Sequence, residues 1–152
     1  AVFAISFIGL IFDLSSSNET LTPQAIFRNL YEQPDAEHVY VQASDESPTR
    51  GTLLISTDGE QAVLRVQQLP DLSSDQTFQL WLIDDAGSKS GGIYQADDQS
   101  EVYILIPNER PINTYNTFGM SIEPAGGSPL GDSPSGQRVF AVNVPTDTSS
   151  GQ

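Results

Sequence analysis

Hydrophobic and polar residues alternate along most of the chain after residue 38, which is the period of a β-strand with one buried face. The runs are short and rich in Val, Ile, Leu, Phe, Tyr and Thr, and clusters of turn-forming residues divide them. A weaker eighth strand is expected over Ser90–Gln95. The seven main strands are predicted over His38–Ala43, Gly51–Thr57, Gln61–Gln68, Gln76–Asp84, Glu101–Ile106, Asn116–Glu123 and Gln137–Val144.

The alternation also assigns the residues that face the core. They are Leu53, Ile55, Leu64, Val66, Phe78, Leu80, Leu82, Val102, Ile104, Ile106, Phe118, Met120 and Ile122.

The turn signals favour antiparallel pairing. Asp58-Gly59 between two strands is typical of a tight hairpin, and Pro70 prevents a central strand from continuing into the next connection. Short strands with no long helix between them predict an all-β fold, an antiparallel two-sheet β-sandwich of seven or eight strands. A small closed barrel is the alternative.

Trp81 falls on the opposite face of its strand from Phe78, Leu80 and Leu82. A strand that is apolar on both faces is normally central and covered on both sides. Trp81 is therefore expected to be buried and structural, and an exposed binding platform is the alternative.

A short helix is predicted before the strands. Thr22 is a suitable N-cap, Pro23 suits the first helical position, and Pro34 closes the segment. The helix places its apolar residues on one face, which is expected to pack on the β-domain or to lie at a bilayer surface. These residues are Ile26, Phe27, Leu30 and Tyr31.

Residues 1–12 carry no charge. As a helix they would rise about 18 Å, part of a hydrocarbon core of roughly 30 Å, so they are predicted to be the C-terminal part of a transmembrane helix. No Lys or Arg follows until Arg28, which places the flank on the extracytoplasmic side of the cell membrane. Because the sequence begins inside an apolar run without Met, a fragment or processed form is expected.

This interpretation divides the chain into four parts. Residues 1–12 are the end of the membrane helix, 13–37 an extracytoplasmic stalk with the short helix, 38–145 the β-sandwich, and 146–152 a disordered tail.

Charge and composition exclude several classes of function. The net charge of −14, from 20 acidic and 6 basic residues, repels nucleic acid. With no Cys, the chain has no disulfide, thiolate nucleophile or blue-copper site.

Catalytic patterns are also missing from the sequence. His38 is the only histidine, and no serine lies in a nucleophile elbow, so a non-catalytic binding module without catalytic, cofactor or metal residues is predicted. The adjacent pairs Asp84/Asp85 and Asp97/Asp98 are interpreted as turn acids, with calcium binding left as an alternative.

Two sequence segments resemble one protein family. The strand Phe78–Asp84 contains Leu80-Trp81-Leu82, and a later strand ends in Glu123-Pro124-Ala125-Gly126-Gly127-Ser128-Pro129, where the two glycines permit positive φ. In this order the segments resemble the C-terminal domain of anti-sigma-K factors of the RskA type. The sequence departs from that pattern at Ser121, where Thr is usual, and in a longer segment over 130–136.

The resemblance implies an extracytoplasmic sensing or tethering domain of a single-pass membrane anti-sigma factor that regulates an extracytoplasmic-function sigma factor. In such proteins a cytoplasmic segment, absent from these 152 residues, binds the sigma factor, and intramembrane proteolysis releases it. The β-domain is then expected to shield the stalk, over Leu14–Gln33, from an activating protease. A membrane-anchored structural accessory subunit, docked on a larger membrane complex, is the alternative.

Overall fold

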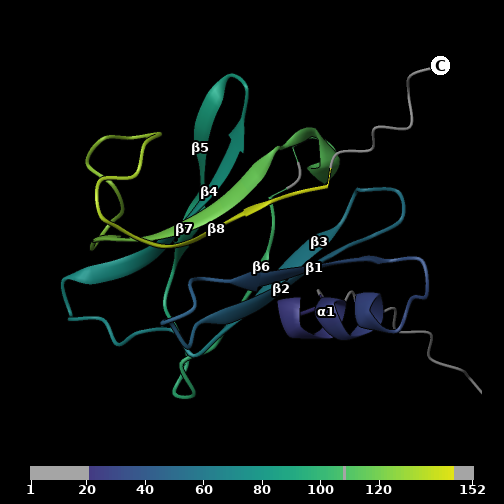
Figure 1. Ribbon diagram of the computed structural model, residues 1–152, viewed down its shortest axis with the longest axis horizontal. Coiled ribbons are helices and arrows are strands. Elements are labelled where there is room, and N and C mark those ends of the chain that lie inside the picture. Colours follow the sequence, from purple (N-terminus) through teal and green to yellow (C-terminus); the bar gives the residue numbers. More distant parts are fainter. Residues whose placement is uncertain (1–20, 108, 146–152) are drawn as a thin grey trace, which may run out of the picture.

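The computed structural model describes residues 21–107 and 109–145, which form two β-sheets and one short helix (Figure 1). The predicted end of a membrane helix and the C-terminal tail lie outside the described residues. No helix in the described ranges has both the length and the apolar composition needed to cross a bilayer. The elements are α1 (Pro23–Tyr31), β1 (Glu37–Gln42), β2 (Arg50–Ile55), β3 (Ala62–Gln67), β4 (Gln76–Asp84), β5 (Gly87–Tyr94), β6 (Val102–Leu105), the 3-10 turn η1 (Ile112–Thr114), β7 (Thr117–Pro124) and β8 (Gln137–Asn143).

Each sheet has four antiparallel strands. The first sheet has the order β1-β2-β3-β6, and the second has the order β5-β4-β7-β8. The chain builds three strands of the first sheet, crosses to form β4 and β5, returns to add β6 beside β3, and completes the second sheet with β7 and β8. The predicted sandwich is confirmed, and the barrel alternative is wrong because the described strands form two separate sheets.

The strand bounds agree closely with the prediction. β4 occupies the predicted range, whereas β5 begins three residues before the weak strand expected over Ser90–Gln95. Its glycines hide the alternation, but one of them is required: a Cβ at Gly91 would lie 2.8 Å from Cδ2 of Leu80 on the neighbouring strand. The pairing of β4 with β5 shifts register at Leu80/Trp81.

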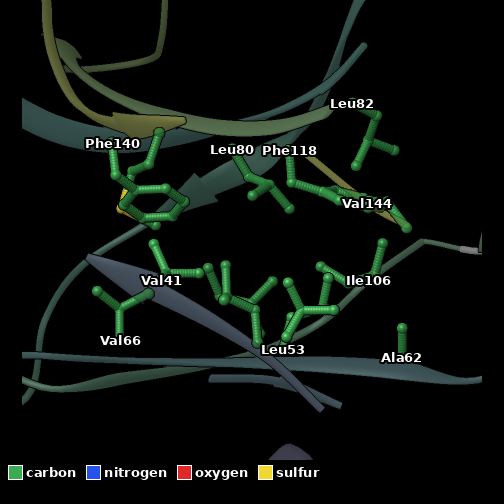
Figure 2. Packing of buried hydrophobic residues seen from close by; sticks show 14 of the residues in the cluster. Val41, Leu53, Ala62, Val66, Leu80, Leu82, Ile106, Phe118, Phe140 and Val144 are labelled. Atoms are coloured by element: carbon green, nitrogen blue, oxygen red, sulfur yellow. The ribbon is translucent and has the colours of Figure 1, made fainter. Parts of the chain in front are cut away.

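The core lies between the two sheets, where side chains from both inner faces meet (Figure 2). All the predicted core residues are buried except Ile122, which is half-buried. The β7–β8 ladder shifts register between Met120 and Ser121, next to Ile122. Phe140 of β8, Val41 of β1 and Ile112 of η1 extend the same cluster.

Helix α1 packs on the outer face of the first sheet, on the side away from the core (Figure 1). The hydroxyl oxygen of Thr22 accepts a hydrogen bond of 3.2 Å from the N–H of Ala25, so the predicted N-cap is present. The apolar face, Ile26, Phe27 and Leu30, is buried against Leu54 and Val63. Each such side chain contributes roughly 1.5–3 kcal/mol on burial, so packing holds a helix of nine residues that would not be stable alone. Of the predicted stripe, Tyr31 remains exposed.

Candidate functional site

The outer face of the second sheet carries polar side chains that are nevertheless buried. Thr77 and Gln79 on β4, and Ser121 and Glu123 on β7, are at most 4% exposed, and the Trp81 ring lies beside them at 2%. In the register, Thr77 lies opposite Glu123 and Gln79 opposite Ser121. The segment that covers this face is residues 125–136, named here the motif loop, which connects β7 to β8 (Figure 1).

A chain of hydrogen bonds runs across these two strands. The indole Nε1 of Trp81 donates to Oγ of Ser121 over 2.8 Å, and that hydroxyl donates to Oε1 of Glu123 over 2.6 Å. Trp81 is thus buried as predicted, and its polar group has a partner. The serine hydroxyl is both acceptor and donor, so the chain ends on a carboxylate.

The Glu123 carboxylate fixes the far end of the motif loop. Its Oε1 accepts from the backbone N–H groups of Ser135 at 3.0 Å and Gly136 at 3.2 Å, and the Ser135 hydroxyl donates to Oε2. Burial raises the pKa of Glu123, but the hydrogen bonds from Ser121, Ser135 and Gly136 outweigh that effect and hold the pKa below its ordinary value. The residue is therefore a buried anion stabilised by donors rather than by a cation.

Gln79 fixes the near end of the loop. Its side-chain oxygen accepts from the backbone N–H of Ser128 over 2.7 Å, and its Nε2 donates to the Ser90 hydroxyl over 2.8 Å. The loop passes so close that a Cβ on Gly127 would lie 3.1 Å from the Gln79 oxygen. Gly126 and Gly127 have φ of 92° and 99°, which confirms the predicted positive-φ turn.

The sequence motif is therefore divided between three environments. Leu80 and Leu82 lie in the core, Trp81 and Glu123 lie under the motif loop, and the rest lies at the end of β7 or in the loop itself. Of these remaining motif residues, Gly127 and Ser128 are half-buried, and Pro124, Ala125, Gly126 and Pro129 are exposed.

Three contributors were missed by the sequence analysis: Gln79, Ser135 and Gly136. Gly136 must lack a side chain, because a Cβ there would lie 1.7 Å from the carbonyl oxygen of Ile122. The available signal was Gln79 itself, a polar residue inside an otherwise apolar run. Nothing local links Ser135 to Glu123, twelve residues earlier.

A hollow of about 190 Å³ opens beside the motif loop. Trp81 and Ile83 line it, and Gly119 and Ala141 leave the space because their side chains are small. It is smaller than the roughly 300–1,000 Å³ typical of ligand pockets.

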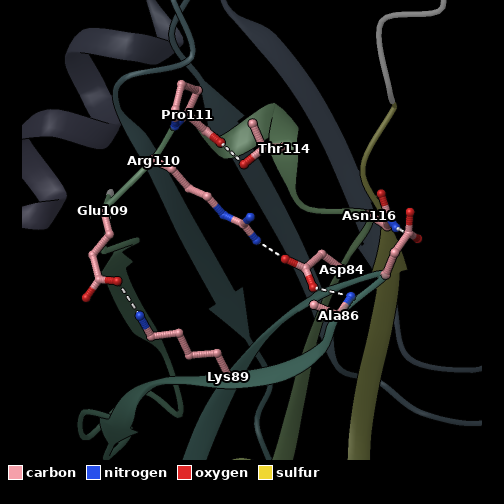
Figure 3. Close-up of polar contacts among 9 residues, drawn as sticks. Asp84, Ala86, Lys89, Glu109, Arg110, Pro111, Thr114 and Asn116 are labelled. Atoms are coloured by element: carbon pink, nitrogen blue, oxygen red, sulfur yellow. Dashed lines mark hydrogen bonds and ion pairs between the residues drawn. The ribbon is translucent and has the colours of Figure 1, made fainter.

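The acidic turns that could have bound calcium are engaged within the protein. Asp84 accepts from Arg110, and Asn116 donates to Asp85 over 2.7 Å (Figure 3). Nearby, Lys89 pairs with Glu109 in the same corner. These contacts support the interpretation of the acids as turn residues.

In the second acidic pair, Asp97 is engaged in the same way. Asp97 accepts from the backbone N–H groups of Gln99 at 2.9 Å and Glu101 at 3.0 Å. Within residues 21–107 and 109–145, no group of three His, Asp or Glu side chains is placed to hold a metal ion.

His38, the single histidine, lies on β1 with its ring 5.4 Å from the ring of Tyr31. The contact with Tyr31 connects α1 to β1, the edge strand of the first sheet.

Comparison with known proteins gives one family and one relative. The family model described as "Anti-sigma-K factor rskA, C-terminal" matches residues 1–138. A curated protein of Streptomyces griseus, described as an uncharacterized protein in phr 5'region, is 26% identical over 96 residues. The alignment covers 63% of this chain and 38% of that protein, so the chain spans well under half of the relative's length. No solved structure matches the chain.

Replacing the buried carboxylate should destabilise the domain. We expect Glu123→Gln to lower the free energy of unfolding by about 1–3 kcal/mol, because a neutral amide weakens charge-assisted hydrogen bonds and brings an NH₂ group against the Ser135 hydroxyl. Chemical denaturation measures the change. Glu109→Gln, which removes an exposed partner of Lys89, is the control and should change stability little; an equal loss in both variants would contradict the assigned role of Glu123.

The Glu123 carboxylate should make the free energy of unfolding depend on pH. Because the folded pKa of Glu123 lies below its unfolded value of about 4.3, its contribution is complete above that pH and is lost as the pH falls through the folded pKa. The difference in unfolding free energy between the natural protein and Glu123→Gln should therefore narrow as the pH is lowered below about 4.3. Denaturant curves at a series of pH values test this, and a constant difference would show that the carboxylate does not titrate as argued.

Proposed function

Because the chain belongs to the family of anti-sigma-K factor RskA C-terminal domains, we propose that it is the extracytoplasmic sensing and tethering domain of a single-pass membrane anti-sigma factor. The family itself implies an anti-sigma factor context. In this proposal the sigma factor, of the extracytoplasmic-function class, is held by a cytoplasmic segment outside these residues, and the membrane is reached through residues 1–12. The domain acts by binding and shielding rather than by a reaction.

The observation that carries the proposal is the docking of α1 on the first sheet. The helix includes residues 23–31 of the predicted stalk, and Leu30 in its last turn is 1% exposed. The segment that leads toward the predicted membrane helix is thus folded onto the sandwich, so its accessibility depends on the state of the β-domain.

Docking gives the shielding a physical basis. A protease cuts a chain that it can hold extended, so cleavage within α1 requires the helix to leave the sheet and unwind. Undocking exposes Ile26, Phe27 and Leu30 as well as Leu54 and Val63, which makes the cleavable state rare. An activating protease at the membrane is the partner that this arrangement would control.

The peptide bond after Arg28 lies within α1, so its cleavage reports undocking and unwinding of the helix. Trypsin should cut there slowly in the full chain, and Leu30→Ala should accelerate that cut at least about tenfold, since removing a buried leucine typically costs about 2–5 kcal/mol. Mass spectrometry of the fragments measures the rate.

Two comparisons make this result specific. Leu130→Ala, which truncates a side chain that is 64% exposed, should leave the rate unchanged. Cleavage after Arg65, in central strand β3, reports global unfolding and should accelerate less than cleavage after Arg28. Equal cutting after Arg28 in all three proteins would refute shielding and favour the accessory-subunit alternative.

The membrane side of the domain can be tested with a single thiol, because the natural chain has no Cys. In intact cells, a membrane-impermeant maleimide should label Leu130→Cys without lysis, since that position is on the surface. The protein without the substitution controls for background. Labelling that appears only after lysis would place the β-domain in the cytoplasm and overturn the proposal.

A further inference from the structure

An open groove of about 400 Å³ runs between α1 and the half of the first sheet's outer face that the helix leaves uncovered. Its size falls in the range of ligand sites. Side chains from α1, β1, β2, β3 and β6 line it, and every one of them is aromatic, charged or hydrogen-bonding. An aliphatic floor, which would suit lipid tails or apolar peptide side chains, is not part of this lining.

Side-chain contacts connect the residues at the floor of the groove to one another. Glu101 holds Arg65 by two hydrogen bonds, 2.8 Å from Nε and 3.3 Å from Nη2. The guanidinium group lies 5.4 Å from the ring centre of Tyr103 and 6.0 Å from that of Phe27, and those two rings meet edge to face at 5.4 Å. A ligand would therefore meet a surface that is already ordered.

Two tyrosine rings rise beside this floor, one from each wall. Tyr31 of α1 is 59% exposed and Tyr40 of β1 is 74% exposed. Tyr40 lies opposite Thr52, which lies opposite Arg65, so the sheet wall presents a ring, a hydroxyl and a cation in one row. Rings of this kind offer apolar faces with polar edges, which suits the similarly two-sided faces of pyranose sugars.

Three of the chain's 6 basic residues lie on this face of an acidic protein. Arg28 and Arg65 line the groove together with one acid, Glu32, and Arg50 lies two residues from Thr52 on the same face of β2. Arg65 is already paired with Glu101. Among the described residues Arg28 has no acidic partner within ion-pair distance. An exposed guanidinium without a partner is well suited to a carboxylate, which it can bind through two parallel hydrogen bonds.

We propose that this groove binds an acidic saccharide, a short run of pyranose rings that carry carboxylate groups. Tyr31 and Tyr40 would stack on the sugar rings, Arg28 would pair with a carboxylate, and Gln24, Glu32 and Thr52 would bond to hydroxyls. An acidic peptide could use the arginines but not the ring faces, and a neutral sugar could use the rings but not the free cation. The inference rests on the proposed sensing function and gives that sensor its ligand class.

Binding here would also act on α1. Because the groove is lined by the helix and by the sheet together, a ligand that fills it contacts the docked state alone and stabilises it by mass action. An occupied groove should therefore slow tryptic cleavage after Arg28.

Three probes of similar length separate the possible ligands in calorimetric titrations of the full 152-residue chain in detergent micelles. Trigalacturonate carries both rings and carboxylates, maltotriose carries rings alone, and triglutamate carries carboxylates alone. We expect trigalacturonate to bind with a dissociation constant at least about tenfold lower than the other two. Equal or tighter binding of triglutamate would show an acidic-peptide site, equal binding of maltotriose a neutral-sugar site, and absence of trigalacturonate binding would overturn the proposal.

Matched variants locate the binding. Tyr40→Ala and Arg28→Gln alter exposed side chains and should each weaken trigalacturonate binding at least about tenfold. Arg138→Gln is the control, because Arg138 is also exposed and has no acidic partner in the described residues, but lies on β8 of the other sheet. Unchanged binding in both groove variants would remove the site from this groove.

The outcome can be separated from that of the proposed function. Cleavage after Arg28 that responds to Leu30→Ala but not to trigalacturonate would overturn the groove and leave the shielding intact. Binding of trigalacturonate, combined with equal cleavage after Arg28 in the natural protein and in Leu30→Ala, would keep the groove and overturn the shielding.

Discussion

The second sheet depends on one buried anion, the carboxylate of Glu123. A carboxylate at 1% exposure is costly unless donors surround it, and here the donors come from the neighbouring Ser121 and from Ser135 and Gly136 at the end of the motif loop. The need to satisfy one acid therefore decides where twelve residues of irregular chain must lie. That chain in turn covers Trp81 and Gln79, which could not remain on an open sheet face at the same burial.

The two sheets solve the same problem with different chemistry. Both have residues on their outer faces that need cover, and in the first sheet these are Leu54 and Val63, which an amphipathic helix covers by apolar packing. In the second sheet they are polar, and a glycine-containing loop covers them by hydrogen bonds. Apolar contact tolerates small shifts, whereas hydrogen bonds demand fixed geometry, so the position of the loop is the more narrowly defined of the two covers.

The sequence was sufficient for the sandwich because short apolar runs with core residues at a period of two, divided by turn signals, mark the main strands, and for α1 because Thr22 and Pro23 give a local start signal. It was insufficient for β5, where Gly91 and Gly92 erase the alternation, and for the loop contacts of Glu123, which join residues twelve positions apart. The family motif includes Trp81 and Glu123, but the hydrogen bonds that join them through Ser121 could not be read from it. The groove beside α1 was out of reach as well, since it depends on side chains that five separate elements bring together.

The motif loop is held near its two ends, by Ser128 on Gln79 and by Ser135 on Glu123. Between these anchors the chain is exposed from Pro129 to Pro134, and it is linked to a strand by the hydrogen bond that the Ser88 hydroxyl of β5 donates to the carbonyl oxygen of Asp132. The length of this segment can therefore vary without disturbing the buried anion. The exposed segment from Pro129 to Pro134 is therefore a suitable place to insert a reporter or an affinity peptide while the sandwich keeps its fold.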